Sequence, residues 1–189
     1  MTTPWLVRSL LVGALVLLLV GALTLMRRAW RAKAARQLDI PPPRARGTVD
    51  SNWVYRPVDG RYLSSTRAGD WLDRIVVHSM GVPSNATMGV SPDGVWIERQ
   101  GGRDIFIPDE SLDEARLDRA ISGKVYEQGG VVVVTWRLGE VVIDTGFRAQ
   151  APERHEELVA AINAVVCDPQ TSAPPTSRVS RGGIPGGLQ

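Results

Sequence analysis

Cysteine and histidine are almost absent from this chain of 189 residues, which contains one cysteine and two histidines. Because Cys167 stands alone, no intrachain disulfide is possible, and a reducing compartment suits the protein. The two histidines, His78 and His155, are far apart and have no cysteine or carboxylate at the spacing of a zinc site. We therefore expect neither a metal nor a cofactor.

The motifs of familiar enzymes are missing as well. The chain has no G-x-S-x-G nucleophile elbow and no G-x-G-x-x-G loop after a strand. Residues 122–125 (SGKV) lack the upstream glycine and the following serine or threonine of a P-loop. We expect a protein that is not an enzyme. One enzymatic alternative stays open, an unfamiliar site near Asp70, Asp73, Arg74 and His78, with the histidine as a general base.

Charge is absent from residues 9–26 (SLLVGALVLLLVGALTLM). Eighteen residues that rise 1.5 Å each form a helix of about 27 Å, close to the hydrocarbon thickness of a bilayer. The sequence therefore predicts one transmembrane helix, preceded by a short N-terminus at residues 1–8.

The orientation of this span follows from the basic residues on its two sides. Only Arg8 precedes it, whereas a membrane-proximal cluster follows it, made of Arg27, Arg28, Arg31, Lys33 and Arg36. Because lysine and arginine are retained on the cytoplasmic side, we expect the N-terminus outside the cell and the rest of the chain in the cytoplasm. A cleaved signal peptide is the rival interpretation, but its charge would precede the apolar run and its end would carry small residues, unlike residues 24–26 (TLM).

Charges of the two signs are separated along the chain. Residues 27–46 carry seven basic residues against one acidic residue, whereas residues 48–166 carry twelve basic against eighteen acidic. The basic segment suits the surface of an anionic bilayer, although it would serve equally as a topology signal alone. The acidic domain argues against nucleic acid as a partner.

Proline and glycine divide the chain into segments. Residues 41–43 (PPP) end any preceding helix and predict a stiff spacer within a basic linker at residues 27–47. One domain follows at residues 48–167. Residues 168–189 are rich in proline, glycine, serine and threonine with little to bury, so we expect a disordered tail there.

Short apolar segments between tight turns predict a β-rich domain. Turn residues such as SPDG at 91–94 and the glycine pair at 101–102 stand at hairpin spacing. Residues 72–78 form a further strand or a turn that leads into one. Tyr126 and its neighbours are expected to pair with a following strand across the glycines at 129–130. The remaining expected strands are residues 60–66, 86–90, 95–99, 104–108, 131–138 and 141–148.

Two helices are expected in the same domain. Residues 111–120 start with Ser111 and Glu114 in a capping-box arrangement. Residues 152–166 form an amphipathic helix whose apolar stripe is Leu158, Ile162 and Val165. Because residues 131–134 (VVVV) are apolar on both faces, their strand must be covered, and this second helix is the candidate cover.

Strands in succession that are closed by one C-terminal amphipathic helix describe the pleckstrin-homology (PH)-like architecture. The run TRAGDWLDR at 66–74, followed by IFIP at 105–108, GKV at 123–125 and TGFR at 145–148, resembles the single-pass membrane proteins with a bacterial PH-like domain found in actinobacteria. This resemblance covers residues 5–166 and implies a mainly β fold, a partly open barrel or sandwich of seven to eight antiparallel strands with a C-terminal helix. It carries over no catalytic residue. Phosphoinositide binding is not expected, because the basic loop of lipid-binding PH domains is not evident.

An anchor without a catalytic motif predicts a cytoplasmic module that binds or scaffolds another protein. Its expected partners are the lipid bilayer and a protein of unknown identity. A candidate interaction rim consists of Asp70, Trp71, Asp73, Arg74 and Arg148. The alternative for the loop residues among them is an ion-paired turn with Trp71 buried in the core. An alternative for the whole protein is an accessory subunit of a membrane transporter, since a single helix cannot form a pathway by itself.

Overall fold

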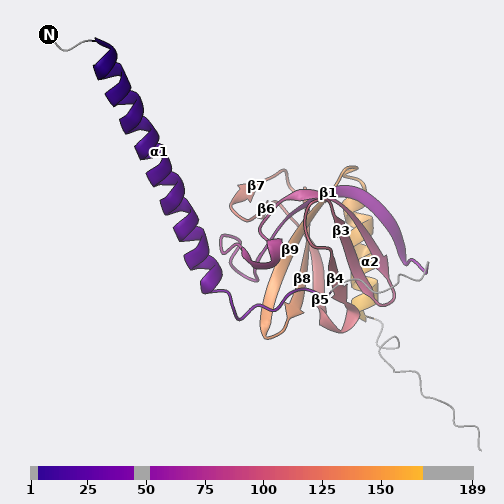
Figure 1. Cartoon of the computed structure of the whole chain (residues 1–189). Helices are drawn as coiled ribbons and strands as arrows, with labels where there is room; N and C mark the ends of the chain where they lie inside the picture. The colour runs from indigo at the N-terminus through magenta and orange to yellow at the C-terminus, as the bar shows by residue number, and fades with distance from the viewer. Residues whose placement is uncertain (1–3, 45–51, 168–189) are drawn as a thin grey trace, which may run out of the picture.

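A long N-terminal helix stands apart from a β-rich domain in the computed structural model, which describes residues 4–44 and 52–167 (Figure 1). The helix, α1 (Pro4–Ala35), contains the apolar run and continues nine residues beyond it, because alanine, arginine and lysine are good helix formers. Within the described residues it is the one helix long and apolar enough to cross a membrane, and none of its apolar window is buried. The predicted disordered tail lies outside the described residues.

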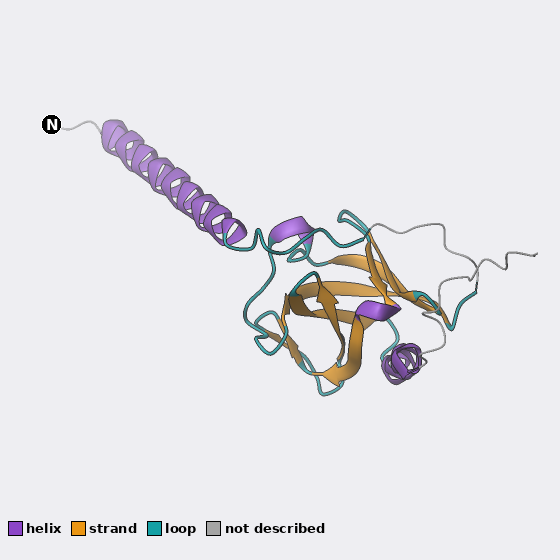
Figure 2. Cartoon of the chain, turned by 90° about the horizontal axis from the view of Figure 1, so that it is seen from below, coloured by secondary structure: helices purple, strands orange, loops and turns teal. Residues whose placement is uncertain are grey.

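Seven strands form one antiparallel sheet in the order β4-β3-β2-β1-β9-β8-β5. The first strand, β1 (Tyr55–Arg67), pairs with β2 through its first half and with β9 through its second half. The sheet therefore wraps around an interior, with the C-terminal helix α2 (Arg154–Cys167) seen end-on beside it in Figure 2. The other strands are β2 (Ser84–Ser91), β3 (Gly94–Arg99), β4 (Ile105–Pro108), β5 (Leu112–Asp118), β8 (Val131–Leu138) and β9 (Val141–Ala149). The predicted fold class is confirmed.

Both faces of β8 are buried, as its valine run predicts. Val132 and Val134 join the main core together with the helix stripe, Leu158, Ile162 and Val165. Val131 and Val133 belong to a smaller cluster on the outer face, which Ile121 covers. Ile121 comes from a two-stranded hairpin, β6 (Ala120–Ile121) and β7 (Lys124–Val125), that the sequence did not reveal. Burying each aliphatic side chain stabilises the fold by roughly 1.5–3 kcal/mol.

Two local predictions were wrong. Residues 111–120 form no α-helix, because β5 follows a short 3-10 turn (η2, Asp109–Ser111) and pairs along its length with β8. That pairing buries Leu112 and Ala115, which an isolated helix would not. Tyr126 and its neighbours do not pair with β8, whose partners are β5 and β9. Residues 72–78 form a turn and no strand, which is the second of the two predicted alternatives. The last two of them begin the 3-10 helix η1 (Val77–Ser79).

The linker after α1 packs against the domain through Gln37 and Ile40, which precede the prolines of the expected spacer. Gln37 is 4% exposed, and its side-chain amide donates to Arg74 O at 3.1 Å while its Oε1 accepts from Val76 N at 2.8 Å. Ile40 is 2% exposed and belongs to the main core. At the end of α1, Lys33 pairs with Asp73 at 3.2 Å. The linker is therefore held on the domain by Ile40 in the core and by the Gln37 amide, which hydrogen-bonds to the backbone of Arg74 and Val76.

Each outer strand of the sheet has part of its free edge covered. On β5, the side-chain amide of Asn163 accepts from Ala115 N at 2.8 Å and donates to Ala115 O at 2.9 Å, as a neighbouring strand would. On β4, Phe106 N donates to the linker residue Arg44 at 3.4 Å. Covered edges of this kind prevent pairing with other chains.

We predict that Asn163→Ala destabilises the domain by about 1–3 kcal/mol, because it leaves the backbone N–H and C=O of Ala115 unpaired beneath α2. Urea unfolding of the full chain in detergent measures this change. Glu156→Ala, at an exposed position of the same helix, is the control and should stay within about 0.5 kcal/mol of the parent. Equal stability of the two variants would contradict the prediction.

We also predict that Ile40→Ala loosens the linker, since it removes a buried side chain from the main core. Amide hydrogen exchange should quicken at Val76, whose N–H is held by Gln37 of the same segment. Leu38→Ala is the matched control, because Leu38 is 83% exposed and two positions away. Unchanged exchange at Val76 in Ile40→Ala would show that the linker does not depend on this contact.

Candidate functional site

The loop after β1 contains most of the predicted interaction rim. Asp70 shapes the loop, since its Oδ1 accepts from Leu72 N at 3.0 Å and from Asp73 N at 3.2 Å. Asp73 pairs with Lys33 at 3.2 Å and with Arg67 at 3.3 Å. These contacts form the ion-paired turn that we considered as the alternative.

Arg74 joins this loop to two other segments. Its guanidinium donates to Ser122 Oγ, to Ser122 O at 3.2 Å and to Gly81 O at 3.4 Å. Ser122 lies in the β6–β7 turn and Gly81 in the loop before β2. The arginine thus holds three loops together, a structural role that uses three of its five N–H groups.

Trp71 is not buried in the core, which corrects one part of that alternative. It exposes 44% of its surface, and the neighbouring Leu72 exposes 61%. Since these large apolar side chains leave much of their surface in water, they are candidates for contact with something outside the domain.

Arg148 lies apart from the loop residues. It stands opposite Arg61 in the β1–β9 pairing, whereas the loop begins after Arg67 at the far end of that pairing. Its guanidinium pairs with Glu127 at 2.5 Å and lies 5.4 Å from the centroid of the Tyr126 ring. The hydrogen bond between them raises the pKa of Arg148 and lowers the pKa of Glu127. The predicted rim is therefore two separate places on the surface.

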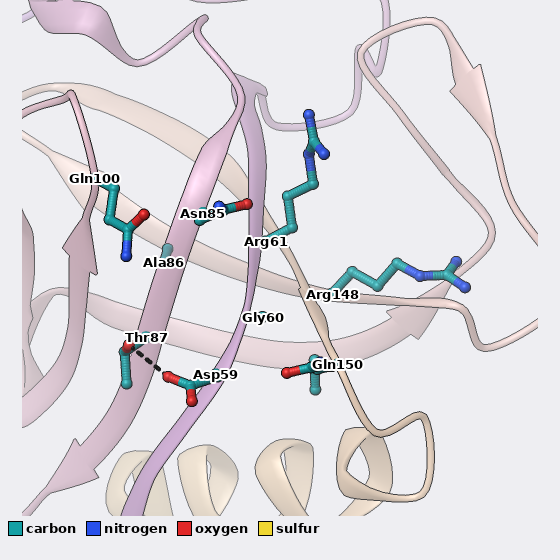
Figure 3. Close-up of a pocket in the computed structure, with 10 residues that line it drawn as sticks. Asp59, Gly60, Arg61, Asn85, Ala86, Thr87, Gln100, Arg148 and Gln150 are labelled. Carbon is teal, nitrogen blue, oxygen red and sulfur yellow. Dashed lines mark hydrogen bonds between the residues drawn. The ribbon is translucent and has the colours of Figure 1, made fainter.

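A polar groove of about 530 Å³ crosses β1, β2 and β9 (Figure 3). Small residues that are neighbours in register, Gly60 with Ala86 and Ala149, lie along its middle. Within it, Thr87 donates to Asp59 at 2.9 Å, and the side chain of Arg61 makes no ion pair or hydrogen bond with any described residue. The groove is rich in amide and charged groups, and the hydroxyl of Thr87 meets the carboxylate of Asp59 in it. The polar side chains along it are Asp59, Arg61, Asn85, Thr87, Gln100, Gln150 and Arg148, the last a member of the predicted rim.

A second cavity, of about 620 Å³, lies between the loop after β1 and the β6–β7 hairpin. Trp71 and Val125 line it together with Arg116 and Asp144. The carboxylate of Asp144, which is 7% exposed, pairs with Arg116 at 2.8 Å and accepts from Thr135 Oγ1 at 2.6 Å. Burial lowers the pKa of Arg116, but the hydrogen bond and charge of Asp144, together with the charges of Glu114 and Asp118, outweigh it and raise that pKa. This pair is satisfied inside the protein and needs no ligand.

A buried arginine that the sequence did not single out holds the loop before β2. Arg99 is 5% exposed, lies 3.9 Å from the centroid of the Tyr62 ring and donates to Ser79 O at 3.0 Å and to Val82 O at 2.7 Å. Burial lowers the pKa of Arg99 and raises the pKa of Tyr62 to about 12. No spacing in the sequence marks this contact, because it joins the end of β3 to a distant loop.

Both histidines have backbone partners. His78 Nε2 lies 2.9 Å from Ile40 O. His155 accepts from Ala149 N with Nε2 at 3.0 Å, so its Nδ1 carries the proton and donates to Gly129 O at 3.0 Å.

Among Asp70, Asp73, Arg74 and His78, all within the described residues, no hydrogen bond joins one side chain to another. No cluster of three metal-ligating side chains occurs in the described ranges 4–44 and 52–167.

We predict that Arg116→Leu costs on the order of 3 kcal/mol, because it leaves the buried carboxylate of Asp144 without its cation. The double variant Arg116→Leu/Asp144→Leu should lose less than the sum of the two single variants. Urea unfolding of the four chains in detergent measures this coupling. Strictly additive losses would show that the pair contributes nothing as a pair.

Comparison with known families agrees with the fold. A family model described as Bacterial PH domain-like matches residues 40–163. The match begins at Ile40, the buried linker residue, and ends at Asn163, which covers the β5 edge. A search of curated proteins found no match.

Proposed function

Because the chain belongs to the bacterial PH domain-like family, we propose that it is a membrane-anchored module whose PH-like domain binds or scaffolds a protein partner. In this proposal α1 crosses a bacterial cell membrane once, with the N-terminus outside and the domain in the cytoplasm. The distribution of basic residues around the span supports this orientation. The domain acts without catalysis in this proposal.

The docked linker is the observation that carries the proposal. Gln37 and Ile40 join the end of α1 to the interior of the domain, and Lys33 pairs with Asp73. A flexible tether would let a domain sample many orientations, whereas a docked one presents the same faces at a constant position beside the bilayer. That arrangement suits a module that holds a partner at the membrane.

The polar groove is the surface that we assign to the partner. Pairing of a peptide with the outer strands is hindered, since Asn163 occupies the β5 edge at Ala115 and Arg44 the β4 edge at Phe106. The groove instead offers unpaired donors and acceptors, Arg61 among them, on the exposed side of three strands (Figure 3). A polar segment of another protein fits this chemistry better than an apolar ligand.

We predict that a photoreactive residue at Asn85 or at Gln100, both in the groove, captures the same protein partner from native membranes. Asp93, exposed in the β2–β3 turn outside the groove, is the control position and should capture nothing in common with them. Arg61→Glu should lower the yield while changing the free energy of unfolding by less than about 0.5 kcal/mol, because the side chain of Arg61 has no partner among the described residues.

Capture of no common protein from the two groove positions would count against a binding module. The transporter-subunit alternative predicts a different pattern, in which a probe at Leu17 in α1 captures a protein with many spans and the groove probes do not.

A further inference from the structure

Three large apolar side chains stand exposed on the domain at one place. Trp71, Leu72 and Val125 expose 44%, 61% and 69% of their surface. The first two belong to the loop after β1 and the third to β7. They are neighbours, because Trp71 and Val125 line one cavity and a Cβ at Gly123 would lie 3.7 Å from Leu72 Cδ2. We refer to Trp71, Leu72 and Val125 as the apolar edge.

The apolar edge lies beside the membrane-proximal end of α1. Figure 1 shows β6 and β7 on the side of the domain that faces this helix, and the Lys33–Asp73 pair ties the loop to its last turns. Lys33 follows Met26, the end of the apolar run, by seven positions, which is about 10 Å along the helix axis. Since the headgroup layer adds about 5–8 Å on each side of the hydrocarbon, Lys33 lies roughly 2–5 Å beyond it, and the loop that pairs with Lys33 stands close to the headgroups.

The charges around the apolar edge favour an anionic surface, although the domain as a whole is acidic. Arg119 lines the same cavity as Trp71, and Lys124 precedes Val125 in β7. Neither basic side chain forms an ion pair with any described residue. Of the nearby carboxylates, those of Asp118 and Asp144 line the same cavity and pair with Arg116 at 3.9 Å and 2.8 Å. The carboxylate of Asp70 accepts two backbone N–H groups of its own loop.

We propose that the apolar edge inserts into the headgroup layer of the same bilayer that α1 spans, so that the domain lies against the membrane surface. This inference rests on the proposed function, because it requires α1 to be a span. Tryptophan favours the membrane interface, and leucine and valine beside it bury apolar area among the headgroups. Arg119 and Lys124 then meet anionic lipid phosphates. The occupant of this surface is thus the lipid itself.

Spin labels at single cysteines in the full chain test this placement. In a Cys167→Ser background, cysteine is introduced one position at a time by Leu72→Cys and Val125→Cys at the edge, Asp93→Cys as an aqueous control and Leu17→Cys within α1. Each labelled chain is reconstituted in vesicles of phosphatidylcholine with phosphatidylglycerol. The ratio of label collisions with oxygen to collisions with a water-soluble nickel complex reports the depth of each label.

Asp93 is a suitable control because it is exposed and lies at the opposite end of β1 from the apolar edge. Val90, just before its turn, pairs with Tyr55 at the start of β1, whereas the edge loop follows Arg67 at the end. The expected result is a collision ratio at residues 72 and 125 several-fold above that at residue 93 and below that at residue 17.

Two other results have distinct meanings. If the label at residue 17 is immersed while the labels at residues 72 and 125 match that at residue 93, the inference is overturned and the anchor stands. If the label at residue 17 meets the nickel complex as freely as that at residue 93, the span itself fails, and the proposed function with it.

Discussion

The buried amide of Gln37 links the apolar helix to the β-domain. Its oxygen accepts a hydrogen bond from Val76 N and its nitrogen donates one to Arg74 O, both in the segment between β1 and β2. Ile40 then enters the main core three residues later. Because these contacts leave no free joint between α1 and the sheet, the position of every surface of the domain relative to the helix follows from them.

The same segment also explains why the loop after β1 is built as it is. Asp73 and Arg67 form a network with Lys33 and Asp39 on the linker side. Arg74 continues the connection to Ser122 in the β6–β7 turn. Residues that the sequence suggested as a rim for a partner therefore serve mainly to join the helix, the loop and the hairpin, and only Trp71 of that loop group is left exposed and apolar.

Much of the sheet was predictable from local chemistry, and the failures have identifiable causes. Turn residues such as the SPDG segment marked the β2–β3 hairpin, and the valine run marked β8 as a strand buried on both faces. The segment that forms β5 was predicted as a helix because Ser111 and Glu114 imitate a capping box. Pairing with β8 outweighs that local preference, since it buries Leu112 and Ala115.

Candidate sites were harder to predict than strands. The groove needs residues of β1, β2 and β9 side by side, and the cavity beside Trp71 needs the β6–β7 hairpin folded over the sheet. Such groupings depend on strand register and on contacts between loops that are far apart in the sequence. Neither leaves a periodic pattern that a single sequence displays.

The sequence by itself determined an apolar helix of membrane length, an asymmetric distribution of basic residues around it, and a β-rich domain ended by one amphipathic helix. These properties depend on composition and on short-range periodicity, which need no knowledge of distant contacts. Only the tertiary structure decided that the linker is docked, that Asn163 covers the β5 edge and that Trp71 faces outward. Each of these depends on two segments that meet across the fold, and their energies come from burial and pairing that arise only when both are in place.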